Sequence, residues 1–201
     1  MIAIIDYNMG NVGSVKNAVE TLGFEVVVTR DEMEIARASH IILPGVGSFG
    51  SGMENLRKFG LTEILTREVR EGKKPFLGLC LGMQLLADAG EEGGEFAGLG
   101  FISGRARKFS DRAGLKIPHM GWNDVSPREG ARLFAGIKRP IFYFVHSYYL
   151  AAQNARVVAA ECEYGEKFAA AIEDGNIFGV QFHPEKSGAA GLKLLENFLK
   201  E

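Results

Sequence analysis

The sequence has few cysteines, few histidines and no marked excess of charge of either sign. It contains 2 cysteines and 4 histidines among 201 residues, and its formal net charge is −2 at pH 7. Two cysteines are too few for a disulfide framework, and the absence of a CxxC pair together with scattered histidines argues against a metal site. The nearly neutral charge gives no reason to expect nucleic acid or an anionic membrane as a partner.

Long apolar runs are also missing. No stretch approaches the roughly 18 residues of a membrane-spanning helix. The first residues, MIAIIDYN, lack the basic and long apolar regions of a signal peptide and instead predict a strand. We therefore expect a cytoplasmic protein, where a lone thiol stays reduced. With 46% hydrophobic residues and no linker or repeat, the chain predicts one domain over residues 1–201.

The first half of the sequence alternates short apolar runs with amphipathic segments. This alternation is typical of βαβ units, in which strands are parallel and helices cover the sheet. Helices are predicted at about 11–22, before Gly72 and from Leu81 onward into LGMQLLADA. The predicted strands lie at 2–6, 24–29, 40–44 and 74–80.

From about residue 98, strand-like pieces follow one another, separated by turn signals such as Gly165-Glu166. We expect these strands to be largely antiparallel, to extend the same sheet, and to precede a closing helix at about 189–200. The predicted fold is α/β and flavodoxin-like: a mainly parallel central sheet flanked by helices, with added antiparallel strands in the C-terminal half. The predicted later strands are 100–109, 117–125, 141–150, 156–165, 167–175 and 176–184.

The segment GLCLG, residues 78–82, has the form Gly-x-nucleophile-x-Gly with cysteine in the central position. A sharp turn from strand to helix strains its central residue and brings backbone segments close together, which glycine tolerates. The turn places the Cys80 thiol at a helix N-terminus, where the dipole favours the thiolate, and it places the Leu81 N–H where it can bind an oxyanion. The alternative is that Cys80 is a small core residue.

A base for this thiol is found in QFHPEKS, residues 181–187. His183 and Glu185 are two residues apart, so their side chains point to the same side of an extended segment. His183 can take the thiol proton while Glu185 orients its ring, which gives a Cys80–His183–Glu185 triad. Alone, the segment is more typical of a surface turn, and only its pairing with Cys80 favours catalysis.

A glycine-rich loop, LPGVGSFGSG at 43–52, follows the third predicted strand. Its glycines allow backbone N–H groups to approach a ligand closely. The loop has no lysine and is not a Walker sequence, and the pattern GxGxxG of dinucleotide binding is absent from the chain. We therefore expect a loop that binds an oxyanion, and no cofactor.

Together, PGVGSFGSGM, GLCLGMQLL and FHPEKS resemble the class I, triad-type glutamine amidotransferase family, and the resemblance covers essentially the whole chain. It implies hydrolysis of glutamine to glutamate and ammonia through a cysteinyl thioester. Met83 and the segments DYNMGN, PHMGWN and YFVHSY are similar to members that pass the ammonia to a cyclase subunit, a (β/α)8 barrel, within a heterodimer. That cyclase makes imidazole glycerol phosphate and an aminoimidazole carboxamide ribotide in histidine biosynthesis.

The same resemblance implies roles for residues outside the triad. The N–H groups of Val46 and Leu81 would form the oxyanion hole. The implied substrate-binding residues are Gly47, Gln84, Glu92, Ser147 and Tyr148. The implied contacts with the partner are Asn11, His119, Trp122, Asn123, Tyr143 and Lys186.

Three other interpretations remain. The chain could be a glutaminase for another acceptor, such as aminodeoxychorismate, anthranilate or pyridoxal phosphate synthesis, although Met83 and PHMGWN speak against this. It could be a stand-alone hydrolase of γ-glutamyl bonds, which would turn over rapidly without a partner. It could also be a binding module in which the cysteine is merely buried.

Overall fold

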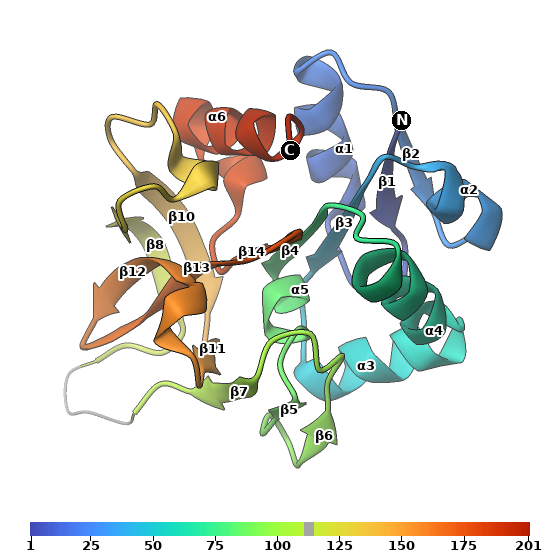
Figure 1. Ribbon diagram of the computed structural model, residues 1–201. Helices are drawn as coiled ribbons and strands as arrows, with labels where there is room; N and C mark the ends of the chain where they lie inside the picture. The colour runs from blue at the N-terminus through green and yellow to red at the C-terminus, as the bar shows by residue number, and fades with distance from the viewer. Residues whose placement is uncertain (111–114) are drawn as a thin grey trace.

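The computed structural model describes residues 1–110 and 115–201, and a central eight-stranded sheet forms its core (Figure 1). The strand order is β2-β1-β3-β4-β14-β13-β12-β9. The first five strands in this order are parallel, and the last three continue the sheet in antiparallel pairing. The bounds are β1 Ile2–Ile5, β2 Val26–Thr29, β3 His40–Gly45, β4 Phe76–Cys80, β9 Ser126–Pro127, β12 Val158–Tyr164, β13 Glu166–Asp174 and β14 Ile177–Val180.

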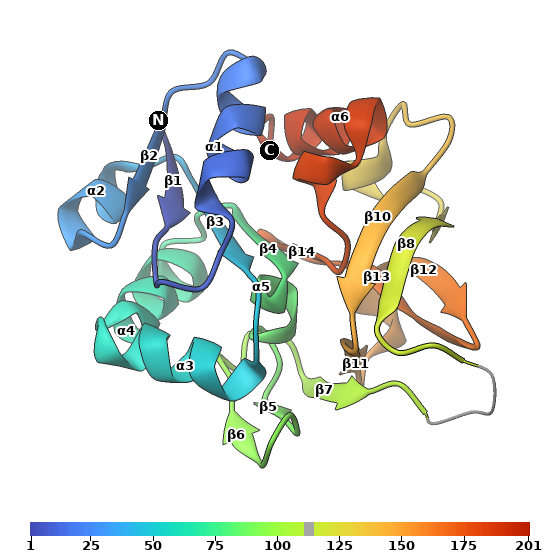
Figure 2. The same ribbon diagram turned by 180° about the vertical axis from the view of Figure 1, so that it is seen from behind.

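Helices cover both faces of the parallel part of the sheet because its strands are apolar on both sides. Helices α1 and α6 pack on one face, which includes Ile4 and Ile42. Helices α2, α3 and α4 pack on the other, which includes Ile5 and Ile41, as expected for alternating side chains along a strand (Figures 1 and 2). The helices are α1 Val12–Thr21, α2 Glu32–Arg37, α3 Phe49–Lys58, α4 Leu61–Leu65 with the π-helical turn Thr66–Glu71, α5 Leu81–Gln84 and α6 Gly188–Phe198. None of the helices in the described part of the chain has the length and apolarity to cross a membrane.

The prediction that all later strands extend the central sheet is wrong for several of them. One separate sheet of four strands has the order β11-β7-β5-β6, and β10 pairs with β8 in a two-stranded sheet at the flank (Figure 2). The apolar run at 141–150, predicted as one strand, is divided at Ser147 into β10 and β11. The break arises because β10 pairs with β8 in one sheet and β11 pairs with β7 in the other. The bounds are β5 Ala89–Gly90, β6 Phe96–Ala97, β7 Gly104–Lys108, β8 His119–Asp124, β10 Ile141–His146 and β11 Tyr148–Ala152.

The helix after Cys80 is also shorter than predicted. Helix α5 ends at Gln84 instead of continuing through LGMQLLADA. The carbonyl groups of residues 85–88 accept hydrogen bonds from N–H groups of residues 98–102, so long-range backbone pairing replaces the helical pattern. Residues 85–88 therefore form an irregular, buried connection, although their apolar sequence favours a helix, because they pair with residues 98–102.

The carboxyl ends of β1, β3, β4 and β14 lie at the same edge of the sheet, because these strands are parallel. Four segments leave the sheet there: the turn at 6–11, the loop at 46–48, the turn at Cys80 and the segment 181–185. Ligands of open α/β sheets bind outside this edge. The fold thus brings the three sequence motifs to one place.

Candidate active site

Cys80 ends β4 in a strained backbone conformation, with φ 52° and ψ −107°. Such a conformation costs a non-glycine residue about 1–3 kcal/mol and persists only where the surroundings enforce it. A Cβ atom on Gly82 would lie 1.9 Å from the Leu43 carbonyl oxygen, and one on Gly78 would lie 2.6 Å from the Gly82 oxygen. The flanking glycines are therefore required by the close backbone approach that the sharp turn creates.

His183 and Glu185 follow β14, which lies beside β4 with Val180 opposite Leu79. His183 Nδ1 is 2.9 Å from Glu185 Oε1, and both side chains are almost fully buried. Burial opposes a charge on the ring, but the interactions with Cys80 and Glu185 prevail and raise the pKa of His183 to about 10. His183 Nε2 is buried and has no hydrogen-bond partner within bonding distance among the described residues, so this nitrogen is available for proton exchange. The three groups that the sequence predicted as a triad meet at one edge of the sheet.

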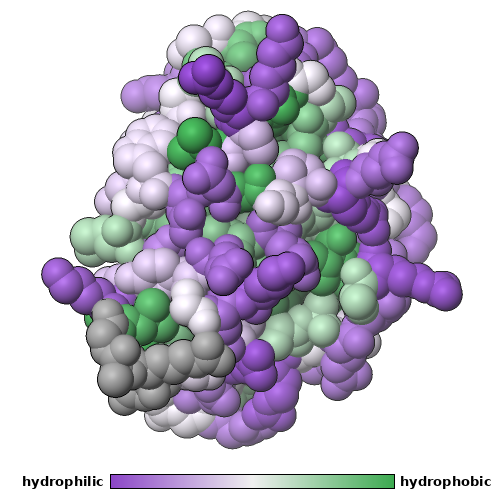
Figure 3. Space-filling model, turned by 90° about the vertical axis from the view of Figure 1, so that its left-hand side faces the viewer, coloured by the Kyte–Doolittle hydropathy of each residue, from purple (hydrophilic) through white to green (hydrophobic). Residues whose placement is uncertain are grey.

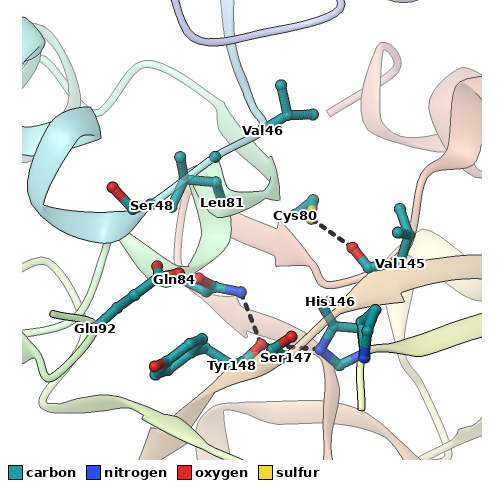
Figure 4. A pocket seen from close by; sticks show the side chains of 12 residues that line it. Val46, Ser48, Cys80, Leu81, Gln84, Glu92, Val145, His146, Ser147 and Tyr148 are labelled. Carbon is teal, nitrogen blue, oxygen red and sulfur yellow. Dashed lines mark hydrogen bonds between the residues drawn. The ribbon is translucent and has the colours of Figure 1, made fainter. Parts of the chain in front are cut away.

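Cys80 opens onto a cavity of about 490 Å³ (Figure 4). The loop after β3, helix α5 and the corner between β10 and β11 form its walls. Pockets of this size hold small metabolites. The cavity lining includes all five residues expected to bind substrate, Gly47, Gln84, Glu92, Ser147 and Tyr148. Among residues 1–110 and 115–201, no group of three or more histidine, cysteine, aspartate or glutamate side chains could hold a metal ion.

The two expected oxyanion donors differ in their state. Leu81 is the first residue of α5, directly after Cys80, and its side chain lines the cavity. The Val46 N–H, in contrast, donates a hydrogen bond to the Met9 carbonyl oxygen at 3.0 Å. In this conformation the Val46 N–H is bonded to the loop after β1. Its hydrogen bond to Met9 would have to break before the Val46 N–H could bind an oxyanion.

Two buried residues at the site were missed by the sequence reasoning. The Gln181 Nε2 lies 3.6 Å from Cys80 Sγ as a donor, and Gln181 is fully buried. The Tyr7 hydroxyl is buried without a hydrogen-bond partner among the described residues and lies against the turn, since a Cβ on Gly45 would be 2.4 Å from it. Burial and the neighbouring Cys80 raise the pKa of Tyr7 far above its usual value, so the phenol stays neutral. A polar residue that directly follows an apolar strand was the available signal for Gln181.

The remaining pocket residues are held by specific hydrogen bonds. Glu92 Oε2 accepts from the Phe49 N–H at 2.8 Å, which ties the start of α3 to the cavity. Gln84 Nε2 donates to the Tyr148 carbonyl oxygen at 2.8 Å, as Figure 4 shows, and lies 3.2 Å from Gln181 Oε1. These contacts fix the walls around the thiol.

Three of the residues expected at a partner interface, Trp122, Tyr143 and Lys186, form a surface cluster on β8, β10 and the segment after His183, in which Tyr143 is half-buried. Trp122 is 59% exposed and contacts the Tyr143 ring edge-on at a centroid distance of 6.1 Å. Lys186 Nζ lies 6.0 Å from the centre of the same ring. Figure 3 views this flank of the molecule, where hydrophobic residues appear as separate patches among hydrophilic ones.

His119 departs from the expectation of an interface residue. It is only 2% exposed, because alternation along β8 turns Met120 and Trp122 outward and His119 inward. Asn123 is half-buried on the same inner side, and Asn11 is exposed at the start of α1, where its side chain accepts from the Ser14 N–H. His119 therefore has its contacts inside the molecule.

The family model of class-I glutamine amidotransferases matches residues 3–201, and the chain belongs to this family. Among its relatives is imidazole glycerol phosphate synthase subunit HisH of Moorella thermoacetica, 53% identical over 98% of this chain and 93% of that protein. Subunit HisH 2 of the same synthase from Methanococcus maripaludis is 50% identical over the full length of both chains.

Solved structures show the same fold at lower identity. A crystal structure of a glutamine amidotransferase superposes with a TM-score of 0.78 at 20% identity, over 100% of this chain and 98% of that one. The structure of PurLQS from Thermotoga maritima gives 0.75 at 20% identity, over 99% and 97% of the two chains. The predicted α/β fold with a mostly parallel sheet and added antiparallel strands is confirmed.

Proposed function

We propose that this chain is the glutaminase subunit of an imidazole glycerol phosphate synthase and acts in histidine biosynthesis. It hydrolyses glutamine and passes the ammonia to a cyclase subunit, a (β/α)8 barrel, with which it forms a heterodimer. The observation that carries the proposal is the convergence of Cys80, His183 and Glu185 beside a cavity of about 490 Å³ in a chain about half identical to HisH subunits. We further propose that residues 1–201 act as one domain, in the cytoplasm.

The reaction follows from the geometry of the triad. The Cys80 sulfur attacks the carboxamide carbon of glutamine, and the carbonyl oxygen becomes an oxyanion that the Leu81 N–H can bind. His183, protonated at neutral pH because its pKa is about 10, gives its proton to the amide nitrogen, which leaves as ammonia when its bond to carbon breaks. Water then attacks the glutamyl thioester while His183 accepts its proton, and cleavage of the carbon–sulfur bond releases glutamate and returns Cys80 and His183 to their starting state.

The Val46 amide provides a means of keeping this site idle. A second donor to the oxyanion is absent while the Val46 N–H is bonded to Met9. Removing one oxyanion donor typically lowers a rate by ~10²–10³. We propose that the partner-bound state releases this amide, so that glutamine is hydrolysed only when the ammonia can be used.

A partner is needed because ammonia released into water at neutral pH becomes mostly ammonium, which has no lone pair for attack. A passage that excludes water avoids this loss. The surface cluster of Trp122, Tyr143 and Lys186 supplies aromatic side chains of the kind enriched at interfaces, with one lysine beside them. We propose that it contacts the cyclase together with Asn11 and Asn123.

The deciding experiment measures glutamine hydrolysis by the chain alone, with the cyclase, and with the cyclase and its nucleotide ligand. We expect slow turnover alone and a rise of at least ~10²-fold in the loaded complex, the effect of one oxyanion donor. Rapid turnover by the isolated chain would instead support a stand-alone γ-glutamyl hydrolase. Failure to bind the cyclase, with activation by the partner of another amidotransferase, would assign a different acceptor.

A further inference from the structure

Two buried histidines lie side by side behind the wall of the cavity. His119 Nδ1 is 3.1 Å from His146 Nε2, and the two residues are 2% and 6% exposed. His146 Nδ1 is 2.8 Å from the Tyr148 carbonyl oxygen, and Asn123 Nδ2 is 3.3 Å from His119 Nε2. Burial lowers the pKa of His119 to about 4 and that of His146 to about 3, so both rings are neutral at pH 7.

The hydrogen-bond partners determine where each ring carries its proton. A carbonyl oxygen only accepts, so His146 must carry its proton on Nδ1, and its Nε2 is then an acceptor. The facing His119 Nδ1 must therefore donate, which leaves His119 Nε2 as an acceptor for the Asn123 amide N–H. The chain of donors thus runs in one direction, from the half-buried Asn123 on β8 to the Tyr148 carbonyl at the cavity wall.

A second series of hydrogen bonds starts at Gln84, which shares that carbonyl, and leads to the nucleophile. The Tyr148 oxygen also accepts from Gln84 Nε2 at 2.8 Å, and both contacts are drawn in Figure 4. Gln84 Nε2 donates in turn to Gln181 Oε1 at 3.2 Å, and Gln181 Nε2 donates to Cys80 Sγ at 3.6 Å. The Tyr148 carbonyl thus joins the side chains of His119 and His146 to those of Gln84 and Gln181, and together they connect strand β8 to the thiol.

We propose that His119 and His146 are positioning residues that relay the placement of strand β8 to Cys80 through Tyr148, Gln84 and Gln181. The proposal deepens the proposed function, on which it rests for the role of Cys80. Strand β8 carries the exposed Trp122, so a change at the outer surface alters the orientation of the amide that faces the thiol.

The surroundings of the pair argue against a role in packing alone. His119 stacks on Phe144 at a centroid distance of 4.7 Å and on Tyr164 at 4.0 Å, and Phe109 and Phe168 contact both histidines. A phenylalanine would fill such an aromatic region without burying polar atoms that require partners. The stacked rings also resist rotation, so a lost donor cannot be replaced by turning a ring over.

Histidine ¹⁵N NMR of the full chain tests the premise of the relay. Signals that show His119 and His146 as neutral rings with the proton on Nδ1 would support the directed chain of donors. Signals that show a proton on Nε2 of His146, or a charged His119 at pH 7, would overturn it.

Two substitutions at His119 distinguish the relay from packing, because the two explanations predict opposite orders for the alkylation rates of Cys80 in the two variants. His119→Phe fills the space but cannot donate to His146, whereas His119→Asn places an amide N–H near the position of Nδ1 in a smaller side chain. The readout is the rate at which iodoacetamide alkylates Cys80 in the isolated chain, followed by mass spectrometry to separate Cys80 from Cys162. Tyr164→Phe is the matched control, since it removes a hydrogen bond to the Lys116 carbonyl beside the same ring but outside the relay.

The relay predicts alkylation about fivefold slower in His119→Phe, the rate equivalent of about 1 kcal/mol for one hydrogen bond. His119→Asn should stay within about twofold of the unsubstituted chain, as should Tyr164→Phe. Alkylation at the original rate in a folded His119→Phe chain, or a slower rate in His119→Asn than in His119→Phe, would overturn the proposal. A complex without glutaminase activity would refute the proposed function instead, because alkylation and NMR do not depend on it.

Discussion

Replacing Val46 by proline tests whether its amide serves the oxyanion. Proline has no N–H, so the variant can neither donate to Met9 in the resting conformation nor bind an oxyanion in the activated one. Val46 is 44% exposed and is not among the residues with positive φ, so neither burial nor a positive φ excludes the proline ring. Gly45 before it has no side chain to clash with the ring.

The expected effects on stability and on rate differ in size. Loss of the single hydrogen bond to Met9 should lower the free energy of unfolding by about 0.5–1.5 kcal/mol. Loss of one oxyanion donor should lower kcat by ~10²–10³, or about 2.7–4 kcal/mol in activation free energy. The rate effect should appear only in the loaded complex, because in the isolated chain this amide is already engaged.

The assay compares glutamine turnover by complexes of the unsubstituted chain, Val46→Pro and Val46→Ala, with chemical unfolding of each chain. Val46→Ala keeps the N–H and should retain kcat within about twofold. A Val46→Pro complex that assembles and turns over glutamine at the original kcat would refute the assignment of this amide to the oxyanion hole. An equal loss in both variants would show that the side chain, rather than the N–H, matters.

Four further predictions concern the triad and its turn. Cys80→Ala should abolish synthesis supported by glutamine yet leave synthesis supported by ammonia nearly intact in the same complex, and loss of both in a folded complex would contradict the division of labour. Glu185→Gln should lower kcat by ~10²–10⁴, because a neutral amide stabilises the His183 imidazolium less and does not fix its tautomer, and rates close to the original would exclude Glu185 from the triad. Since the pKa of His183 rises from 6.5 to about 10 on folding, its contribution to stability is complete below pH 6.5 and is lost as pH rises through about 10; urea unfolding should show this decline, and His183→Gln should flatten it. Gly82→Ala would place a Cβ 1.9 Å from the Leu43 oxygen and should prevent stable folding, so a melting temperature close to the original would disprove that the turn needs this close approach.

Local patterns predicted the parts of the molecule that depend on neighbours in sequence. The alternation of apolar runs and amphipathic segments predicted the parallel strands, because strands buried on both faces need continuous apolar side chains. The form of GLCLG predicted the turn at Cys80, because the close approach of Gly82 to Leu43 leaves no room for a side chain. The spacing of His183 and Glu185 predicted their hydrogen bond, although Pro184–Lys186 forms a short 3-10 helix where an extended segment was expected.

Other features depend on partners that are distant in sequence. The segment 141–150 is divided at Ser147 because its second half pairs with β7. Helix α5 ends early because the residues after it bond to residues 98–102. His119 points inward because it packs in the buried aromatic cluster. The state of the Val46 amide is decided by Met9, 37 positions earlier in the chain, as the sequence positions show. No local pattern encodes such contacts.

The amino-acid sequence by itself determined which reactive groups this protein possesses, since the identity and spacing of a thiol, an imidazole and a carboxylate are properties of the chain. Only the tertiary structure decided how these groups are connected to the rest of the molecule. The physical reason is that buried polar atoms must find partners wherever the fold places them, and here those partners come from three segments, 80–84, 146–148 and 181–185, that are far apart in the sequence.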